Sequence, residues 1–379
     1  MSIELISLLD SDREHGIIEA NRLLTICNAC RYCEGYCPVF PAMTEHRTFI
    51  AGTLDYLANL CHQCTACYHA CQYKPPHELQ VNLPPVLSKL RTETYANFTW
   101  PSAAAPFFQR NLALTAWVVS TCVLLLCGAM AVFTPAGTMT TVYDEPGAFY
   151  AVMPHHIMAG IAGAIACFGV LSLGVSSFRF GHHCGLTIRD LRSLSNWAAT
   201  LRAIATLQHL GGGHGEGCQT TDTTFSNRRR FYHQLTMWGF VLCFLATASA
   251  TVYELVLGRL SPFPYFSWPV ILGTTGGLGL IIGPLGLLAL KRHSTSPALP
   301  TDPAGLDVSL LCQLLLISAT GLALLAGRST PAMPWLLTVH LGLVYGFFLT
   351  LPFGKFVHGI YRTLALLRYN ASQRDPHSP

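Results

Sequence analysis

Six long apolar stretches constrain the fold of this 379-residue chain more than any other feature. They lie at 113–133, 154–177, 231–257, 266–290, 308–326 and 334–357. Each is roughly 19 to 27 residues long, enough for a helix to cross a hydrocarbon core about 30 Å thick. Charged residues make up only 11% of the chain, against roughly 25% in soluble domains. The sequence therefore predicts a six-helix transmembrane bundle, and it excludes a single soluble domain and a disordered chain.

Residues 1–100 have a different character. They contain seven Lys/Arg and ten Asp/Glu, and no apolar stretch in them approaches 18 residues. The acidic start of the chain lacks the basic and apolar regions of a signal peptide, so we expect this segment to stay in the cytoplasm. We predict a cytoplasmic domain at 1–100, a linker at 101–112 and a membrane domain at 113–379, with an inner loop at 178–230.

Basic residues predict the orientation of the six spans. If residues 1–112 are cytoplasmic, the inner regions after residue 100 carry 14 Lys/Arg and the outer loops carry two, Arg259 and Arg328. This asymmetry fits the positive-inside rule, so we expect a multi-pass protein of the bacterial inner membrane with both termini cytoplasmic.

In the inner loop, Gly211–Gly217 has no phosphate-binding pattern and is interpreted as a flexible loop. The run Arg228–Arg230 is interpreted as a lipid-facing anchor, with a docking surface as the less favoured alternative. The near-neutral net charge of +4 excludes a nucleic-acid partner.

Eight cysteines form two runs with the same spacing within residues 1–100. The runs are Cys27-x2-Cys30-x2-Cys33-x3-Cys37 and Cys61-x2-Cys64-x2-Cys67-x3-Cys71. Disulfides do not suit a reducing cytoplasm, and structural zinc does not need two four-cysteine runs. In two-cluster ferredoxin-type domains, the fourth cysteine of each run binds the other cluster. The spacing predicts two [4Fe-4S] clusters, one on Cys27, Cys30, Cys33 and Cys71, the other on Cys61, Cys64, Cys67 and Cys37.

The other seven cysteines are scattered singly and are interpreted as packing residues. They are Cys122, Cys127, Cys167, Cys184, Cys218, Cys243 and Cys312. Glycines in the fourth stretch predict close helix packing there.

Histidines in or beside the apolar stretches are candidate haem ligands, because ionisable groups in a membrane are costly. The candidates are His155, His156, His233, His340 and His358. His340 and His358 are 18 residues apart, which on one helix is five turns, so we expect them on one face about 27 Å apart. His155 or His156 is expected at about the same depth in the membrane as His340, and His233 at about the same depth as His358, so each pair could meet. Two such bis-histidine pairs would hold two b-type haems and one pair would hold one. The alternative is that the histidines at helix ends are ordinary interfacial residues.

The remaining polar groups add little to these predictions. His182, His183, His214 and His293 are expected in loops, exposed to solvent. Arg230 or Arg362 is a candidate to balance the negative charge of haem propionates.

The chain has no G-x-G-x-x-G unit opening a helix after a strand, so electrons must come from another polypeptide or a diffusible donor. A reduced flavoprotein is the expected partner and a membrane quinone the expected acceptor, although no motif marks a quinone pocket.

Three segments resemble the tricarballylate (citrate) utilisation protein B family: CNACRYCEGYCPVFPA at 27–42, CHQCTACYHAC at 61–71 and MPWLLTVHLGLVYGFFLTLPFGKFVHG at 333–359. The resemblance covers nearly the whole chain. It implies a mainly α protein, with a two-cluster ferredoxin-like domain followed by a six-helix membrane cytochrome of b type. It also implies two [4Fe-4S] clusters, haem b, and reoxidation of the FAD of a dehydrogenase that converts tricarballylate to aconitate.

Two other functions stay open from the sequence. One is the iron–sulfur and cytochrome b subunit of another quinone-linked dehydrogenase or of a heterodisulfide-reductase-like complex. The other is a non-catalytic membrane redox sensor, which would need an output module that the chain lacks. For the electron-transfer functions the substrate chemistry lies on a partner flavoprotein, and we assign no catalytic residue to this chain.

Overall fold

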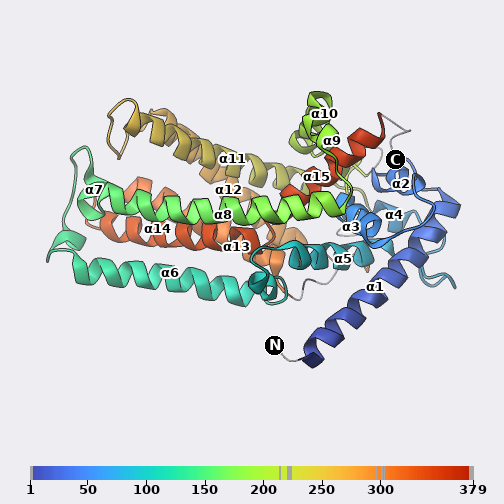
Figure 1. Ribbon diagram of the computed structural model, residues 1–379. Helices are drawn as coiled ribbons and strands as arrows, with labels where there is room; N and C mark the ends of the chain where they lie inside the picture. Colours follow the sequence, from blue (N-terminus) through green and yellow to red (C-terminus); the bar gives the residue numbers. More distant parts are fainter. Residues whose placement is uncertain are drawn as a thin grey trace.

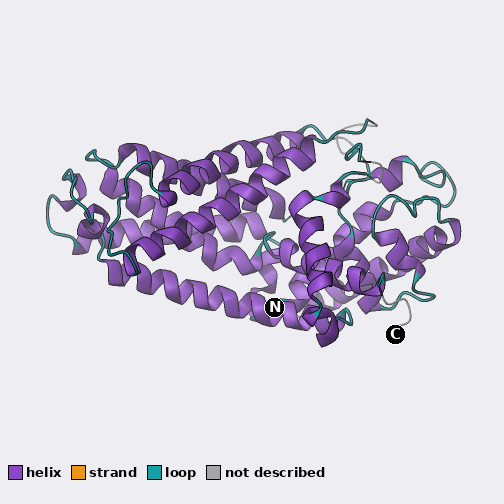
Figure 2. Cartoon of the chain, turned by 90° about the horizontal axis from the view of Figure 1, so that it is seen from above, coloured by secondary structure: helices purple, strands orange, loops and turns teal. Residues whose placement is uncertain are grey.

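The computed structural model describes residues 3–212, 215–219, 224–294, 297–299, 302 and 304–374. Across these residues the chain is mainly helical and has no β-strand (Figure 2), apart from an isolated bridge between Cys218 and Ser226. The mainly α fold class is therefore confirmed.

Long apolar helices run side by side along the molecule (Figure 1). Six helices in the described residues are long and apolar enough to cross a membrane. They are α6 (Asn111–Phe133), α8 (His155–His183), α11 (Arg228–Leu255), α12 (Trp268–Arg292), α13 (Leu306–Gly327) and α14 (Met333–Thr350), which continues as the 3-10 turn η4 (Leu351–Phe353). At most of their ends, these helices agree with the six predicted apolar stretches to within a few residues. Much of their apolar surface faces outward, as in Leu124 and Phe178, which are 71% and 75% exposed. These helices are compatible with a multi-pass membrane protein.

The last span ends earlier than the apolar pattern predicts. The sequence suggested one helix over 334–357, but η4 ends at Phe353, and Gly354 has an extended backbone. Pro352 lacks a backbone N–H, so the helical hydrogen-bond pattern cannot continue through it. A separate helix, α15 (Val357–Ser372), begins after the break. His340 and His358 therefore lie on different helices, and the expectation that one helical face carries both is wrong.

The N-terminal elements gather at one end of the bundle (Figure 1). They are α1 (Ile3–Cys30), α2 (Val39–Thr44), α3 (Ala51–Leu60), α4 (Ala66–His69), α5 (Leu83–Phe98) and the 3-10 helix η1 (Ser102–Phe108). The short elements between the spans are η2 (Thr138–Thr140), α7 (Ala148–Val152), α9 (Ile188–Arg192), α10 (Leu194–Thr206) and η3 (Gln208–Leu210). The predicted linker at 101–112 thus contains η1 and the first two residues of α6.

The N-terminal elements and the bundle share one hydrophobic core. Buried residues of α1, α3 and α5 pack together with Phe180 of α8 and Tyr361 of α15. The rings of Phe180 and Tyr361 stack with their centres 4.4 Å apart, and Tyr95 of α5 meets Tyr361 at 5.4 Å. The N-terminal elements are therefore joined to one end of the bundle by packed side chains.

Glycines bring α11 and α12 into close contact. A Cβ atom added at Gly283 of α12 would lie 2.7 Å from the backbone nitrogen of Thr236 and 2.9 Å from the carbonyl oxygen of Tyr232, both in α11. A Cβ at Gly239 of α11 would lie 2.9 Å from the carbonyl oxygen of Gly276. Such approaches exclude any side chain, so the small residues of the fourth span have the packing role that the sequence predicted.

Candidate iron–sulfur centres and an adjoining histidine pair

The first cysteine run occupies the end of α1 and the turn that follows it. Cys27 and Cys30 lie in the last turn of α1, and Arg31 then takes a left-handed backbone with φ of 55°. Backbone hydrogen bonds close the turn, from Arg31 N to Cys27 O at 2.9 Å and from Tyr36 N to Cys33 O at 3.0 Å. Cys37 comes just before α2. Three thiols are thereby presented from one tight turn, as a cubane cluster requires.

The second run begins where α3 ends. Gln63 and Thr65 have left-handed backbones with φ of 53° and 62°, which fold the segment between Cys61 and Cys67 into a compact loop. Cys67 lies in α4, and Cys71 follows that helix. The two runs contact one another, with Cys33 Sγ 4.0 Å from the carbonyl oxygen of Cys67.

The thiols fall into two neighbourhoods by their mutual electrostatic influence. Burial, together with the neighbouring thiols of Cys33, Cys71 and Cys30, raises the pKa of Cys27 to about 12. Burial also raises the pKa of Cys37 well above its usual value, with added contributions from Cys64 and Cys61. The thiols that act most strongly on Cys37 thus belong to the second run, whereas Cys71 acts on Cys27 and Cys33 of the first run. This proximity matches the predicted crossed grouping, while ligation itself stays a prediction.

A cavity of about 190 Å³ lies among these cysteines. Its lining includes five thiols, those of Cys27, Cys30, Cys33, Cys67 and Cys71. Crowded, buried thiols lose their protons with difficulty, because neighbouring thiolates repel one another and burial disfavours their charge. A bound metal centre offsets this negative charge and stabilises the thiolates. No three His, Cys, Asp or Glu side chains of the described residues are spaced to hold a single metal ion. A four-iron cluster has a larger core than one ion, so the thiols and cavity fit a cluster better than a mononuclear metal.

The two cysteine groups differ in exposure. Tyr32, within the first run, is 65% exposed, and Cys27, Cys30 and Cys33 are only partly buried. In the second group Cys61 and Cys64 are 9% and 6% exposed, whereas Cys37 and Cys67 are partly buried like the first group. The most buried thiols therefore belong to the second group.

The structure brings His233 of α11 and His358 of α15 together. Their ring centres are 6.2 Å apart, and the ring planes are inclined by 81°. Two metal–nitrogen bonds of about 2 Å each, plus the distance from each nitrogen to its ring centre, add up to about 6 Å. The separation therefore suits two imidazoles that share one iron.

The ring nitrogens of His358 are arranged as those of metal-ligating histidines usually are. Nδ1 of His358 lies 2.5 Å from the carbonyl oxygen of Lys355, to which it donates, and this leaves Nε2 for another partner. Burial, with Arg362 and Lys355 nearby, holds the pKa of His358 well below its usual value. A neutral imidazole is the form that binds metals. Nδ1 of His233 is buried without a hydrogen-bond partner.

The outer histidines are not brought together in the same way. His340 Nδ1 lies 3.0 Å from Thr320 Oγ1 of α13, and the ring packs against Gly321. His155 Nε2 instead lies 3.5 Å from Glu254 Oε2, and its ring meets Tyr150. His156 is exposed at the start of α8. Among the described contacts none joins His155 or His156 to His340, so the outer pair stays a prediction.

Two of the histidines expected in loops, His182 and His183, instead lie in the last turn of α8. His183 ends α8, and its Nε2 lies 3.0 Å from Asp55 Oδ2, which Arg13 also contacts at 3.1 Å. Asp55 is 1% exposed, so its hydrogen bond with His183 links α8 to the N-terminal elements. His182 and His293 are exposed, and His214 lies outside the described residues.

The inner loop covers the second cysteine run. Gln219 N donates to Cys64 O at 3.1 Å, and Thr65 Oγ1 donates to Gln219 O at 2.8 Å. Leu207, Leu210 and Cys218 pack against Cys64. In the interpreted lipid anchor, Arg229 donates to Gln63 O and Arg230 to Thr206 O, so these two side chains turn toward the protein. The Gly-rich part includes residues outside the described ones, but its flanks form an ordered cover.

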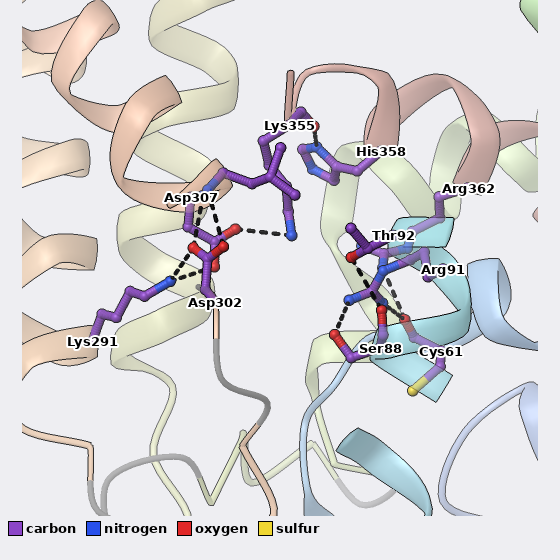
Figure 3. A network of polar contacts seen from close by, with 11 residues as sticks. Cys61, Ser88, Arg91, Thr92, Lys291, Asp302, Asp307, Lys355, His358 and Arg362 are labelled. Carbon is purple, nitrogen blue, oxygen red and sulfur yellow. Dashed lines mark hydrogen bonds and ion pairs between the residues drawn. The ribbon is translucent and has the colours of Figure 1, made fainter. Parts of the chain in front are cut away.

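Buried cationic and histidine side chains that sequence reasoning missed surround this run. Figure 3 shows Arg91 and Arg362 both directed at Cys61, with His358 on the same helix as Arg362. His62 lies between two cysteines of the run, and its ring centre is 5.3 Å from that of His209. Burial lowers the pKa of His209 to about 4. The sequence signals for this group were the position of His62 within the run and Arg362, which was expected beside haem propionates and whose contact with Cys61 was not predicted.

Comparison with known proteins agrees with this architecture. The family model described as Citrate utilization protein B matches residues 108–378, and that described as Citrate utilization protein B Fer4-like domain matches residues 20–97. The curated Citrate utilization protein B of Escherichia coli is 42% identical over 362 residues, covering 94% of this chain and 92% of the relative. No solved structure matches the chain. The Fer4-like match, the six apolar helices and the identity along almost the whole length show that this chain belongs to the Citrate utilization protein B family.

Proposed function

We propose that this protein transfers electrons from a reduced flavoprotein, through two [4Fe-4S] clusters and b-type haem, to a membrane quinone. We further propose that it works in citrate or tricarballylate utilisation, with the FAD-dependent dehydrogenase as the donor. Iron–sulfur clusters and haem supply one-electron chemistry, which matches a two-electron flavin to a membrane carrier. The bacterial inner membrane, with both termini in the cytoplasm, is the proposed location.

One observation carries the proposal. Arg362 donates to the carbonyl oxygen of Cys61 at 2.8 Å, and it lies one turn after His358 on α15. The second cysteine group and the His233–His358 pair are thus joined through a single side chain and one helical turn.

The exposure of the cysteine groups supports an order for the electron path. Cys27, Cys30, Cys33 and Cys71 would hold the cluster nearer the surface, where a partner flavoprotein can approach. Cys61, Cys64, Cys67 and Cys37 would hold the cluster nearer the bundle. His233 and His358 would hold haem at the inner end of the spans, and His340 would serve a second haem with a partner still to be identified.

The test is the iron, acid-labile sulfide and haem content of the purified full-length protein. We expect about eight irons in two four-iron clusters, with one or two further irons in haem. The double variant Cys27→Ser with Cys61→Ser should lose the cluster absorbance, and His358→Ala should lose a b-type haem signal. The variant Cys167→Ser, at an exposed thiol on α8, is the matched control. A wild-type protein without clusters would refute the electron path, and one without haem would refute its membrane half.

A further inference from the structure

Three arginines from distant parts of the chain converge on the backbone of the second cysteine run. Arg91 of α5 donates to Cys61 O at 2.9 Å, and Arg362 of α15 donates to the same oxygen at 2.8 Å. Arg229 of α11 donates to Gln63 O at 2.5 Å. Three guanidinium groups therefore lie beside the loop that carries Cys61 and Cys64.

These cations are buried or partly buried and have no acidic partner among the described ion pairs. Arg91 is 2% exposed, and Arg362 and Arg229 are partly buried. Burial and the nearby Arg91 lower the pKa of Arg362 to about 10. Within the part of the chain that the structure describes, none of the three forms an ion pair with a carboxylate. Buried charge is costly unless an opposite charge lies close by, so this cluster of arginines calls for an anion.

In the described residues no buried arginine contacts the first cysteine group. Arg31 within its run is exposed and donates to Asn28 O at 3.1 Å, and Lys74 lies over the ring of Tyr68 at 5.5 Å. The charges that act on Cys27 and Cys33 come from other thiols, whereas Arg229 acts on Cys64. The two groups therefore differ in charge environment as well as in exposure.

This difference bears on the direction of electron flow. A four-iron cluster with four thiolate ligands is an anion, and reduction adds one more negative charge. Burial alone disfavours added charge and so works against electron transfer from an exposed cluster to a buried one. Nearby positive charge has the opposite effect, because net charge and hydrogen bonding set cluster potentials.

We propose that Arg91, Arg229 and Arg362 raise the reduction potential of the cluster held by Cys61, Cys64, Cys67 and Cys37 above that of the cluster held by the first group. One electron then passes from the first cluster, which is oxidised, to the second, which is reduced, and no bond or proton changes place. The three arginines are positioning residues for electron flow. The inference rests on the two clusters of the proposed function.

The experiment is a potentiometric titration of the purified full-length protein, followed by electron paramagnetic resonance of the reduced clusters. Wild type is compared with Arg362→Gln, Arg362→Lys and the control Arg202→Gln, which removes an exposed arginine of α10. Comparison with Cys27→Ser assigns each signal to its cluster. Quantifying the signals shows whether both clusters are present before their potentials are compared.

In Arg362→Gln we expect the reduced-to-oxidised ratio of the second cluster at fixed potential to fall at least tenfold, a shift of 59 mV for one electron. The first cluster should keep its potential, Arg362→Lys should recover most of the shift, and Arg202→Gln should match wild type. If Arg362→Gln fails to assemble the second cluster, the partly buried Arg229→Gln decides, with the same shift expected. Two clusters with unchanged potentials, or with equal shifts in both, overturn this inference alone. A wild type without clusters overturns the proposed function as well.

Discussion

At the scale of single residues, ligand candidates differ from other histidines in which ring nitrogen, Nδ1 or Nε2, contacts a protein group. His358 and His340 each use Nδ1 for a protein partner, Lys355 O and Thr320 Oγ1, which leaves Nε2 free. His155 instead directs Nε2 to Glu254. Sequence position alone identified five candidates, but it could not distinguish these cases, because ring orientation depends on neighbours in other helices.

We predict that His340→Ala loses one b-type haem per chain and keeps the signal of the His233–His358 pair. The imidazole of His340 has a free Nε2 deep in the bundle, and alanine offers no ligand in its place. The haem-to-protein ratio, measured by the pyridine haemochrome method, checks this. His182→Ala, at an exposed histidine on α8, is the control and should keep the full ratio. An unchanged ratio in His340→Ala would show that this residue binds no haem.

At the scale of elements, the apolar stretches predicted the spans well, and the last of them was predicted too long. Hydropathy identifies segments that suit a membrane, but it does not register that Pro352 and Gly354 interrupt the backbone pattern. The break lets α15 leave the bundle and approach α3 and α10, so that Arg362 reaches Cys61. Close packing of α11 on α12, by contrast, follows from the glycines visible in the sequence.

We predict that Gly283→Val lowers the haem occupancy of the His233–His358 pair. The new side chain would overlap the α11 backbone at Thr236 and Tyr232, on either side of His233, and overpacking of this kind costs about 1–3 kcal/mol. Optical spectra of the purified variant measure occupancy. Gly128→Val is the matched control, because nothing lies within 4 Å of a Cβ at Gly128. Equal occupancy in the two variants would mean that α11 tolerates displacement at His233.

At the scale of the whole molecule, the N-terminal elements and the bundle behave as one packed body. Tyr361 is 2% exposed and lies between Tyr95 of α5 and Phe180 of α8. The hydrogen bond between His183 and Asp55 forms a second link between the two parts. The sequence suggested a cytoplasmic domain connected by a linker, and the shared core goes beyond that expectation.

We predict that Tyr361→Ala destabilises both parts together, by about 3–5 kcal/mol as for other large aromatic truncations. Thermal unfolding followed by circular dichroism, with cluster and haem absorbance recorded in parallel, measures the effect. Tyr361→Phe keeps the stacked ring and should lie close to wild type. If the bundle kept its melting temperature while the N-terminal part alone lost stability, the shared core would not couple them.

The sequence by itself determined the features that depend on local pattern. Length and hydropathy define the six spans, and the spacing of eight cysteines predicts two neighbouring groups, because these properties lie within short segments. Only the tertiary structure decided which segments meet. Arg362 and Cys61 are 301 positions apart, and Arg229 and Gln63 are 166 apart. Contacts over such separations depend on how whole helices pack and where their backbones break, and neither is encoded in local periodicity.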